Sequence, residues 1–167
     1  DEGFDVTYLM PDAAGFIHPE NLLKAMRPDT ILVSIMMANN EIGTIQPISD
    51  LAYIAHTNGC EGCLFHTDAV QAYGQIPIDV KRLGVDLLSA SAHKIYGPKG
   101  IGLLYIRDGV TLTPLIFGGG QESGIRGGTE NVPAIAGLGE AAEEIYENLD
   151  EKRAHLYGLK QRFIDGI

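Results

Sequence analysis

Residues 30–37, TILVSIMM, are apolar almost without interruption. A strand with one solvated face alternates apolar and polar residues, so this run instead indicates a strand of a parallel sheet that helices cover on both faces. The polar loop Asn39–Gly43 follows the run, and a segment with helical spacing follows the loop. Strand-like and helix-like segments continue to alternate, which predicts an α/β fold with three αβα layers around a mainly parallel sheet.

The same periodicity and the turn residues predict the order of the elements. We expect strands at 4–9, 30–37, 63–67, 85–89 and 101–106, and helices at 19–26, 48–58, 80–83, from 134 onward and from 156 to the end. Thr129 is a good N-cap for the helix that carries Pro133 in its first turn. Residues 118–131 contain six glycines and therefore form a loop.

Charge and apolar content exclude several classes of protein. The net charge of −10, from 22 acidic and 12 basic side chains, disfavours nucleic acid as a partner because such a surface repels phosphates. No apolar run approaches the roughly 18 residues of a membrane span, and the first residues lack the pattern of a signal peptide. Cys60 and Cys63 make no disulfide framework. We expect a cytoplasmic protein without a membrane partner and, since residue 1 is not Met, a piece of a longer chain.

Two polar clusters lie where predicted strands end. Asp68 and Gln71 follow the strand at 63–67. Ser91, His93 and Lys94 follow the strand at 85–89. In an open α/β sheet such positions face the crevice at the carboxyl ends of the strands, where ligands bind. A lysine and an aspartate from different strands suit pyridoxal 5′-phosphate (PLP), which takes a Lys for its Schiff base and an acid for its pyridinium nitrogen.

Four motifs, in this order, carry a resemblance to a known family. They are NNEIGTIQPI from Asn39, HTDAVQ from His66, SAHKIYGPKGIG from Ser91 and GGGQESGIRGGTEN from Gly118. Together they resemble the NifS/IscS-type cysteine desulfurases, which are PLP-dependent enzymes of fold type I in the class-V aminotransferase family. The resemblance implies that residues 1–149 are a PLP-binding large domain without its N-terminal portion. It also implies that residues 150–167 are a helix leading into a small domain.

The resemblance also implies roles for individual residues. Lys94 is the catalytic lysine, which binds PLP covalently and later moves protons on the substrate. Asp68 is the carboxylate that pairs with the pyridinium nitrogen and makes the ring an electron sink. Gln71 donates to the ring hydroxyl, and Asn40 lies near that hydroxyl and the substrate carboxylate. The phosphate contacts fall to Ser91, His93 and, across a homodimer, Thr129.

The implied reaction removes sulfur from L-cysteine and leaves alanine. In this family a cysteine thiolate of the enzyme takes the sulfur as a persulfide and passes it to a sulfur-acceptor protein, for iron–sulfur clusters or thio-cofactors. That cysteine lies C-terminal to the motif at Arg126–Thr129, where this sequence has no Cys. The family's N-terminal phosphate-binding turn, its ring-stacking His and its late substrate-binding Arg are also missing. Gly127 stands where Ser or another small residue is often found. The chain is therefore expected to carry half a site.

Other interpretations stay open at this point. The parent protein is alternatively a selenocysteine lyase or another class-V PLP enzyme, or the chain is a silent domain that folds without binding PLP. Lys94 and Asp68 would each be unremarkable alone, as a surface lysine and a helix cap. Their occurrence together, next to Ser91 and His93, favours the cofactor site.

The remaining cysteines and histidines favour structural roles. At about 3.3 Å per residue, Cys60 and Cys63 lie toward the opposite end of their strand from Asp68, so we expect a buried structural pair rather than a nucleophile. A zinc site would need a second pair of ligands. His18 and His66 have no evident partner in the sequence, and we expect both to be structural or exposed.

Overall fold

The computed structural model describes residues 3–167 and divides the chain into two compact units. Unit 1 comprises the chain up to Ala72, Ile78–Ala90 and Leu104–Asp108. Unit 2 comprises Tyr73–Pro77, Ser91–Leu103 and Gly109–Ile167.

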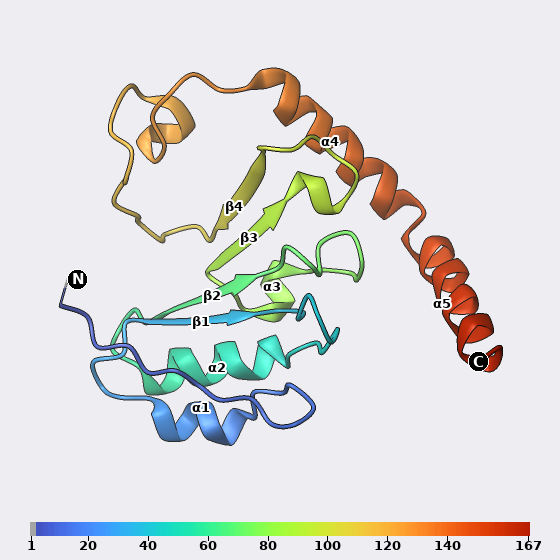
Figure 1. The fold of residues 1–167 in the computed structure, drawn as a ribbon. Helices are drawn as coiled ribbons and strands as arrows, with labels where there is room; N and C mark the ends of the chain where they lie inside the picture. The colour runs from blue at the N-terminus through green and yellow to red at the C-terminus, as the bar shows by residue number, and fades with distance from the viewer. Residues whose placement is uncertain (1–2) are drawn as a thin grey trace. The chain divides into compact units, whose positions relative to one another are not determined.

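A four-stranded sheet with the order β1-β2-β3-β4, most of whose residues belong to unit 1, forms the centre of that unit (Figure 1). Strands β1 and β2 are parallel, as are β2 and β3. The backbone bonds Arg107 N–H to Asp86 O (2.8 Å) and Ala92 N–H to Ile101 O (3.1 Å) show that β4 runs antiparallel to β3. The predicted α/β class with a mainly parallel sheet is confirmed. The strands are β1 Leu32–Met36, β2 Leu64–Asp68, β3 Leu87–Ser91 and β4 Gly102–Ile106.

Helices cover one face of this sheet (Figure 1). Helix α2 (Ile48–Asn58) packs on β1 and β2, and helix α1 (Pro19–Ala25) packs on α2. The strand residues facing them are buried, and those between are less so. Burying Leu51 and Phe65 completely stabilises this layer by about 1.5–3 kcal/mol each. Within unit 1 the helices thus form one layer, and the second layer of the three-layer arrangement remains a prediction.

The ends of the elements follow local capping chemistry. Helix α1 begins with Pro19 at its first position, as predicted. In the short helix α3 (Val80–Leu83), the Asp79 carboxylate accepts from the N–H groups of Lys81 and Arg82. Gly84 ends α3 with a φ of 70°, a left-handed conformation that glycine adopts without strain.

The strand predicted at residues 4–9 is wrong. The structure assigns no strand there, and the side chains of Phe4, Val6 and Tyr8 are exposed. Apolar residues at every second position indicate an extended segment, but a strand also needs a neighbouring backbone to bond with. Among residues 3–167 no strand pairs with this segment.

Unit 2 is built around two helices and two short 3₁₀ turns, η1 (Ala92–Lys94) and η2 (Gln121–Gly124). The helices are α4 (Val132–Glu147) and α5 (Leu149–Asp165), and Asn148 separates them. Asn131 caps α4 by accepting from the N–H of Ala134 at 3.3 Å. The predicted cap at Thr129 is therefore wrong. Asn131 immediately precedes the first helical turn and supplies the side-chain oxygen itself.

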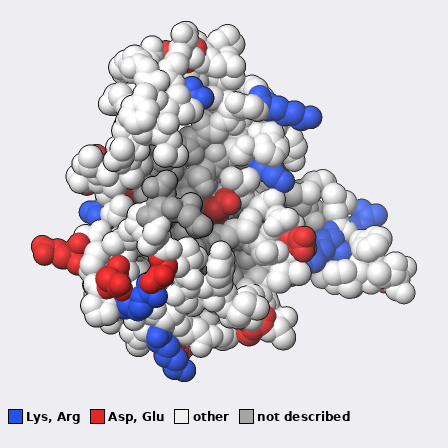
Figure 2. Space-filling view, turned by 60° about the vertical axis from the view of Figure 1, so that its left-hand side comes forward, with Lys and Arg blue, Asp and Glu red and all other residues white. Residues whose placement is uncertain are grey.

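The surface agrees with the charge balance of the sequence. On the face drawn in Figure 2, the Lys and Arg side chains of the described residues are scattered and interspersed with acidic ones, without a continuous basic patch. Among the helices of residues 3–167, none is both long enough and apolar enough to cross a bilayer.

Candidate functional site

Asp68 is the last residue of β2, at the carboxyl edge of the sheet in unit 1. It pairs with Met36 on β1 and with Ser89 on β3. Its carbonyl accepts from the N–H of Met37 at 2.8 Å, which fixes the backbone. Carboxylate oxygen Oδ1 accepts from the N–H of Val70 at 2.8 Å, and Oδ2 takes no hydrogen bond within the described part of the chain. The half-buried side chain therefore keeps one oxygen for a ligand.

His66 lies two residues before Asp68 on the same face of β2 and links three strands. Its Nδ1 is 2.8 Å from Ser34 Oγ on β1, and its Nε2 is 3.3 Å from Ser89 Oγ on β3. Burial lowers the pKa of His66, and the negative charge of Asp68 opposes this only in part. The neutral His66 imidazole and the hydroxyl groups of Ser34 and Ser89 thus form a polar row across the three strands, next to Asp68.

Asn40 lies at the tip of a short hairpin that follows β1. The hairpin pairs Met37 with Gln46 (N–H of Gln46 to O of Met37, 2.9 Å) and Asn39 with Thr44 (N–H of Asn39 to O of Thr44, 2.9 Å). The Asn39 side chain is used internally, because its Oδ1 accepts from the N–H groups of Glu41 and Ile42. The Asn40 amide is exposed and makes no side-chain hydrogen bond within residues 3–167, so it is available to a ligand.

In unit 2, the catalytic lysine of the prediction stands on the 3₁₀ turn η1 that follows β3. Ala92 and Ile95 are fully buried, which leaves His93 and Lys94 between them exposed. Ser91 Oγ lies 2.7 Å from His93 Nδ1. A hydroxyl, an imidazole and an amine thus occur within four residues, a donor set suited to a phosphate and a carbonyl.

Backbone bonds to one carbonyl hold η1 in shape. The N–H groups of Ile95 (3.0 Å) and Gly97 (2.9 Å) both donate to the carbonyl of Ala92. Tyr96, between them, has a φ of 67°, which costs a non-glycine residue about 1–3 kcal/mol. The surrounding packing of Ala92 and Ile95 keeps the turn in this conformation despite the cost.

Gly74 supports this turn from below. Its φ is 75°, and a Cβ there would lie 2.5 Å from Ile95 Cγ2 and 3.1 Å from Ile145 Cδ1. Its N–H donates to the Tyr146 hydroxyl at 3.1 Å, and the rings of Tyr73 and Tyr146 meet edge to face at 5.3 Å. The absence of a side chain at Gly74 therefore allows Ile95, the residue directly after Lys94, to pack against the Gly74 backbone.

Replacing Gly74 with Ala is expected to destabilise unit 2 by about 2–4 kcal/mol, from overpacking and from the positive φ. Urea-dependent hydrogen exchange of the α4 amides measures the change. Gly158→Ala in α5 is the matched control, because a Cβ there meets nothing within 4 Å. It is expected to leave α4 unchanged and to favour α5 slightly. Equal stability of the Gly74→Ala variant and the parent would contradict the packing described here.

The glycine-rich segment of unit 2 folds back on itself. A Cβ on Gly127 would lie 3.0 Å from the backbone of Gly118, and the N–H of Gly127 donates to Ile116 O at 3.2 Å. Gly128 N–H donates to Gln121 Oε1 at 3.2 Å. The Thr129 side chain is exposed at the end of this loop. Within the described residues, no hydrogen bond joins Thr129 to the η1 turn.

The predicted site residues therefore fall into two groups. Unit 1 brings Asn40, Asp68 and Gln71 to the carboxyl ends of β1 and β2. Unit 2 carries the second group, which is Ser91, His93, Lys94 and Thr129. The convergence of Lys94 with Asp68 on one ring stays a prediction.

The donors and acceptors of the two groups fit PLP. Asp68 offers a carboxylate oxygen without a partner, as a pyridinium nitrogen requires, and Asn40 offers a free amide. Lys94 is an accessible amine beside the Ser91–His93 pair. Asp68 would bind the pyridinium nitrogen of the cofactor, Lys94 its carbonyl carbon, and the Ser91–His93 pair its phosphate.

The cysteines do not take part in these groups. Cys63 is buried next to the first residue of β2, at the opposite end from Asp68, and burial raises the pKa of its thiol. Cys60 is half-buried in the preceding turn. Groups of three or more side chains able to bind a metal are absent from the described residues. Cys63 is buried as expected and Cys60 only partly so, and the structural role of the pair stays a prediction.

Sequence reasoning missed the partners of the histidines. His56 on α2 contacts the buried Asp86 at 2.7 Å, and His18 contacts Asp12 at 2.7 Å. His66, whose contacts are described above, is structural as expected. One signal was present, since Asp86 is a lone acid inside the apolar run VDLL and needs a partner if buried.

Comparison with known proteins extends over nearly the whole chain. The profile of the family described as "Aminotransferase class-V" matches residues 1–166. The chain is 54% identical to a cysteine desulfurase IscS of Methanosarcina thermophila over 166 residues, which are 99% of this chain and 40% of that protein. It is 51% identical over 168 residues to a mitochondrial cysteine desulfurase of Saccharomyces cerevisiae, covering 99% of this chain and 33% of that protein. The chain thus spans 33–40% of the length of these curated relatives.

Solved structures show the same similarity. A protein described as NifS-like matches with a TM-score of 0.94 and 48% identity, over 99% of this chain and 45% of its own. A structure described as "SspA in complex with cysteine" matches with a TM-score of 0.80 and 52% identity, over 84% of this chain and 40% of its own. Both similarities agree with the predicted fold class.

Proposed function

The chain belongs to the class-V aminotransferase family, whose members use PLP, and we propose that the protein containing it is a cysteine desulfurase. The substrate is L-cysteine, and the products are alanine and a protein-bound persulfide. The observation that carries the proposal is 54% identity to a cysteine desulfurase over 99% of the chain. The accessible Lys94 and the ligand-free oxygen of Asp68 support it.

Each group of site residues has its own part in this proposal. PLP, when bound, supplies an electron sink for the bond changes at the substrate Cα. Asp68 keeps the ring nitrogen protonated. The hydrogen bond between His66 and Ser89 holds the end of β2 that carries Asp68 against β3. Lys94 binds the cofactor covalently and carries the proton to and from the substrate. Asn40 and Gln71 bind the ring hydroxyl, and Asn40 also faces the substrate carboxylate.

The phosphate falls to the residues of unit 2. The Ser91 hydroxyl and the His93 imidazole, 2.7 Å apart, provide two donors next to Lys94. Thr129 adds a hydroxyl from a second copy of the chain, and its exposure suits that role. The proposal therefore includes a homodimer in the full-length protein.

Domains, partners and location complete the proposal. Residues 1–149 belong to the PLP-binding large domain, and 150–167 lead toward a small domain. The break between α4 and α5 at Asn148 suits this boundary. The persulfide goes to a sulfur-acceptor protein, and the location is the cytoplasm, without a membrane or nucleic-acid partner.

Adding PLP to the purified full-length protein and reducing with borohydride tests the proposal. We expect a stable mass increase on the peptide that carries Lys94, and alanine released from L-cysteine in proportion to sulfide under reducing conditions. Reduction traps the bond between the cofactor and a lysine, so the readout does not depend on turnover. Modification of another lysine alone, or release of no alanine by the PLP-loaded protein, would contradict the assignment.

A further inference from the structure

We propose that Gln46 is a positioning residue, which holds the Asn40 hairpin against the turn at residues 12–18 and so fixes Asn40 relative to Asp68. The inference rests on the proposed function, because it gives Asn40 a ligand to meet. Gln46 itself touches neither the substrate nor the cofactor in this proposal. Its action runs through the backbone of unit 1, which contains all of these residues.

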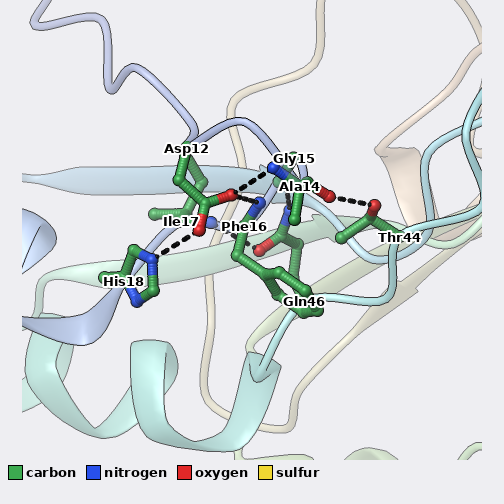
Figure 3. A network of polar contacts seen from close by, with 8 residues as sticks. All are labelled: Asp12, Ala14, Gly15, Phe16, Ile17, His18, Thr44 and Gln46. Carbon is green, nitrogen blue, oxygen red and sulfur yellow. Dashed lines mark hydrogen bonds and ion pairs between the residues drawn. The ribbon is translucent and has the colours of Figure 1, made fainter.

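The Gln46 side-chain amide bonds to the backbone of the turn at 12–18, in the way that the backbone of a neighbouring strand would (Figure 3). Its Oε1 accepts from the N–H of Ile17 at 2.8 Å, and its Nε2 donates to the carbonyl of Gly15 at 2.7 Å. The two bonds pair the amide with the backbone as a strand would. Because both ends of the amide are used, a side chain without a donor and an acceptor in this geometry cannot replace it.

The backbone of Gln46 continues this connection to the site. Its N–H donates to Met37 O at 2.9 Å, and the N–H of Met37 donates to Asp68 O at 2.8 Å. An unbroken series of hydrogen bonds therefore leads from the turn at Ile17, through the base of the hairpin, to the end of β2. Shared bonds of this kind couple the position of the Asn40 tip to that of Asp68.

The turn at 12–18 is held together by its own hydrogen bonds. Asp12 Oδ1 accepts from the N–H groups of Ala14 and Phe16, both at 2.9 Å, and Oδ2 lies 2.7 Å from His18 Nε2 (Figure 3). These bonds, first that from Phe16, lower the pKa of Asp12, so the carboxylate is charged at neutral pH. The segment that bonds to Gln46 therefore has hydrogen bonds of its own that do not depend on Gln46.

The hairpin and the turn are also in steric contact. Gly15 has a φ of 84°, and a Cβ there would lie 2.5 Å from Ile42 Cδ1 and 3.0 Å from Thr44 Oγ1. The Thr44 hydroxyl donates to Ala14 O at 2.6 Å. Ile42 is two residues from Asn40, so displacing its side chain displaces the tip. Gly15→Ala thus perturbs the same contact as Gln46→Met by an independent route.

The test uses Gln46→Met in the full-length protein, which keeps the length of the side chain and removes both hydrogen-bonding groups. In the cofactor-free protein, we expect the amide hydrogens of Asn39 and Gly43 to exchange roughly tenfold faster. In the PLP-loaded protein, we expect KM for L-cysteine to rise about tenfold with a smaller fall in kcat, and the visible absorbance of the bound cofactor to shift. Gly15→Ala is expected to reproduce these changes.

His56→Gln is the matched control, because it weakens unit 1 at the opposite end of β2 without touching the hairpin. It is expected to leave hairpin exchange, KM and the absorbance unchanged. Unchanged exchange in Gln46→Met would overturn the inference, and so would faster exchange with unchanged KM and absorbance, which means a structural role alone. A wild-type protein that takes up no PLP would instead overturn the proposed function, and with it the ligand that Asn40 is positioned to meet.

Discussion

Replacing Lys94 with Ala in the full-length protein is expected to abolish the visible absorbance of the bound cofactor and to lower alanine release by at least about 10⁴-fold. Lys94 is the accessible amine of the η1 turn, between the buried Ala92 and Ile95. In the proposed function, removing Lys94 takes away both the covalent attachment and the proton carrier, and each such role contributes about 10²–10⁴-fold. Absorbance after dialysis and alanine formation with saturating L-cysteine measure the two losses.

Lys81→Ala is the control for this experiment. Lys81 lies on the exposed helix α3 of unit 1, outside the residues assigned to the site, and its removal is expected to change neither readout. Stability is checked by hydrogen exchange of the α4 amides, which should be the same in both variants. Retained turnover in Lys94→Ala would show that another group does the chemistry and would remove the basis of the assignment.

The parts of the fold that periodicity specifies were predictable. The apolar run at 30–37 and the strand that ends at Asp68 were located to within two residues, because burial against α2 requires their side-chain pattern. The segment at 4–9 has an alternating pattern too, but a pattern says which face is apolar and not whether a partner strand exists. The covering of the second sheet face stays a prediction, because the helices of unit 1 lie on one face.

The sequence predicted which residues make up the candidate site, but not the hydrogen bonds that support them. Asp68 ends a strand and Lys94 follows one, and the sequence pattern predicts both placements. The support of Asn40 was not predicted, since Gln46 meets the backbone of Gly15 and Ile17, about 30 residues earlier in the chain. A side-chain amide that bonds to distant backbone leaves no periodic signal, because any backbone segment can supply the partner.

Replacing Asp86 with Ala is expected to cost unit 1 about 3–5 kcal/mol of stability, the largest effect outside the proposed site. The Asp86 side chain has no exposure and joins three elements. It lies 2.7 Å from His56 Nε2 on α2 and accepts from the Phe65 N–H on β2 and from Arg107 Nε after β4, both at 2.6 Å. Its loss leaves the buried N–H of Phe65 unpaired, which alone costs about 1–3 kcal/mol. Urea-dependent hydrogen exchange of the β2 and β3 amides measures the change.

Arg107→Met separates the parts of this network and gives the control. The Arg107 side chain is 53% exposed, so losing its bond to Asp86 is expected to cost only about 0–1 kcal/mol. A loss equal to that of Asp86→Ala would contradict the view that the buried carboxylate carries the stability.

The same carboxylate predicts how the stability of unit 1 depends on pH. Burial raises the pKa of Asp86, but the hydrogen bonds from His56, the Phe65 N–H and Arg107 together outweigh it, and the pKa lies below its ordinary value. A pKa that is lower in the folded state stabilises the protein above the unfolded value, about 4, and this contribution is lost as the pH falls through the folded pKa. The difference in stability between wild type and Asp86→Ala should therefore be constant from pH 7 to about pH 5 and shrink below about pH 4. A difference that persists undiminished at pH 3 would mean that the charge of Asp86 contributes little, and that packing around its side chain accounts for the effect.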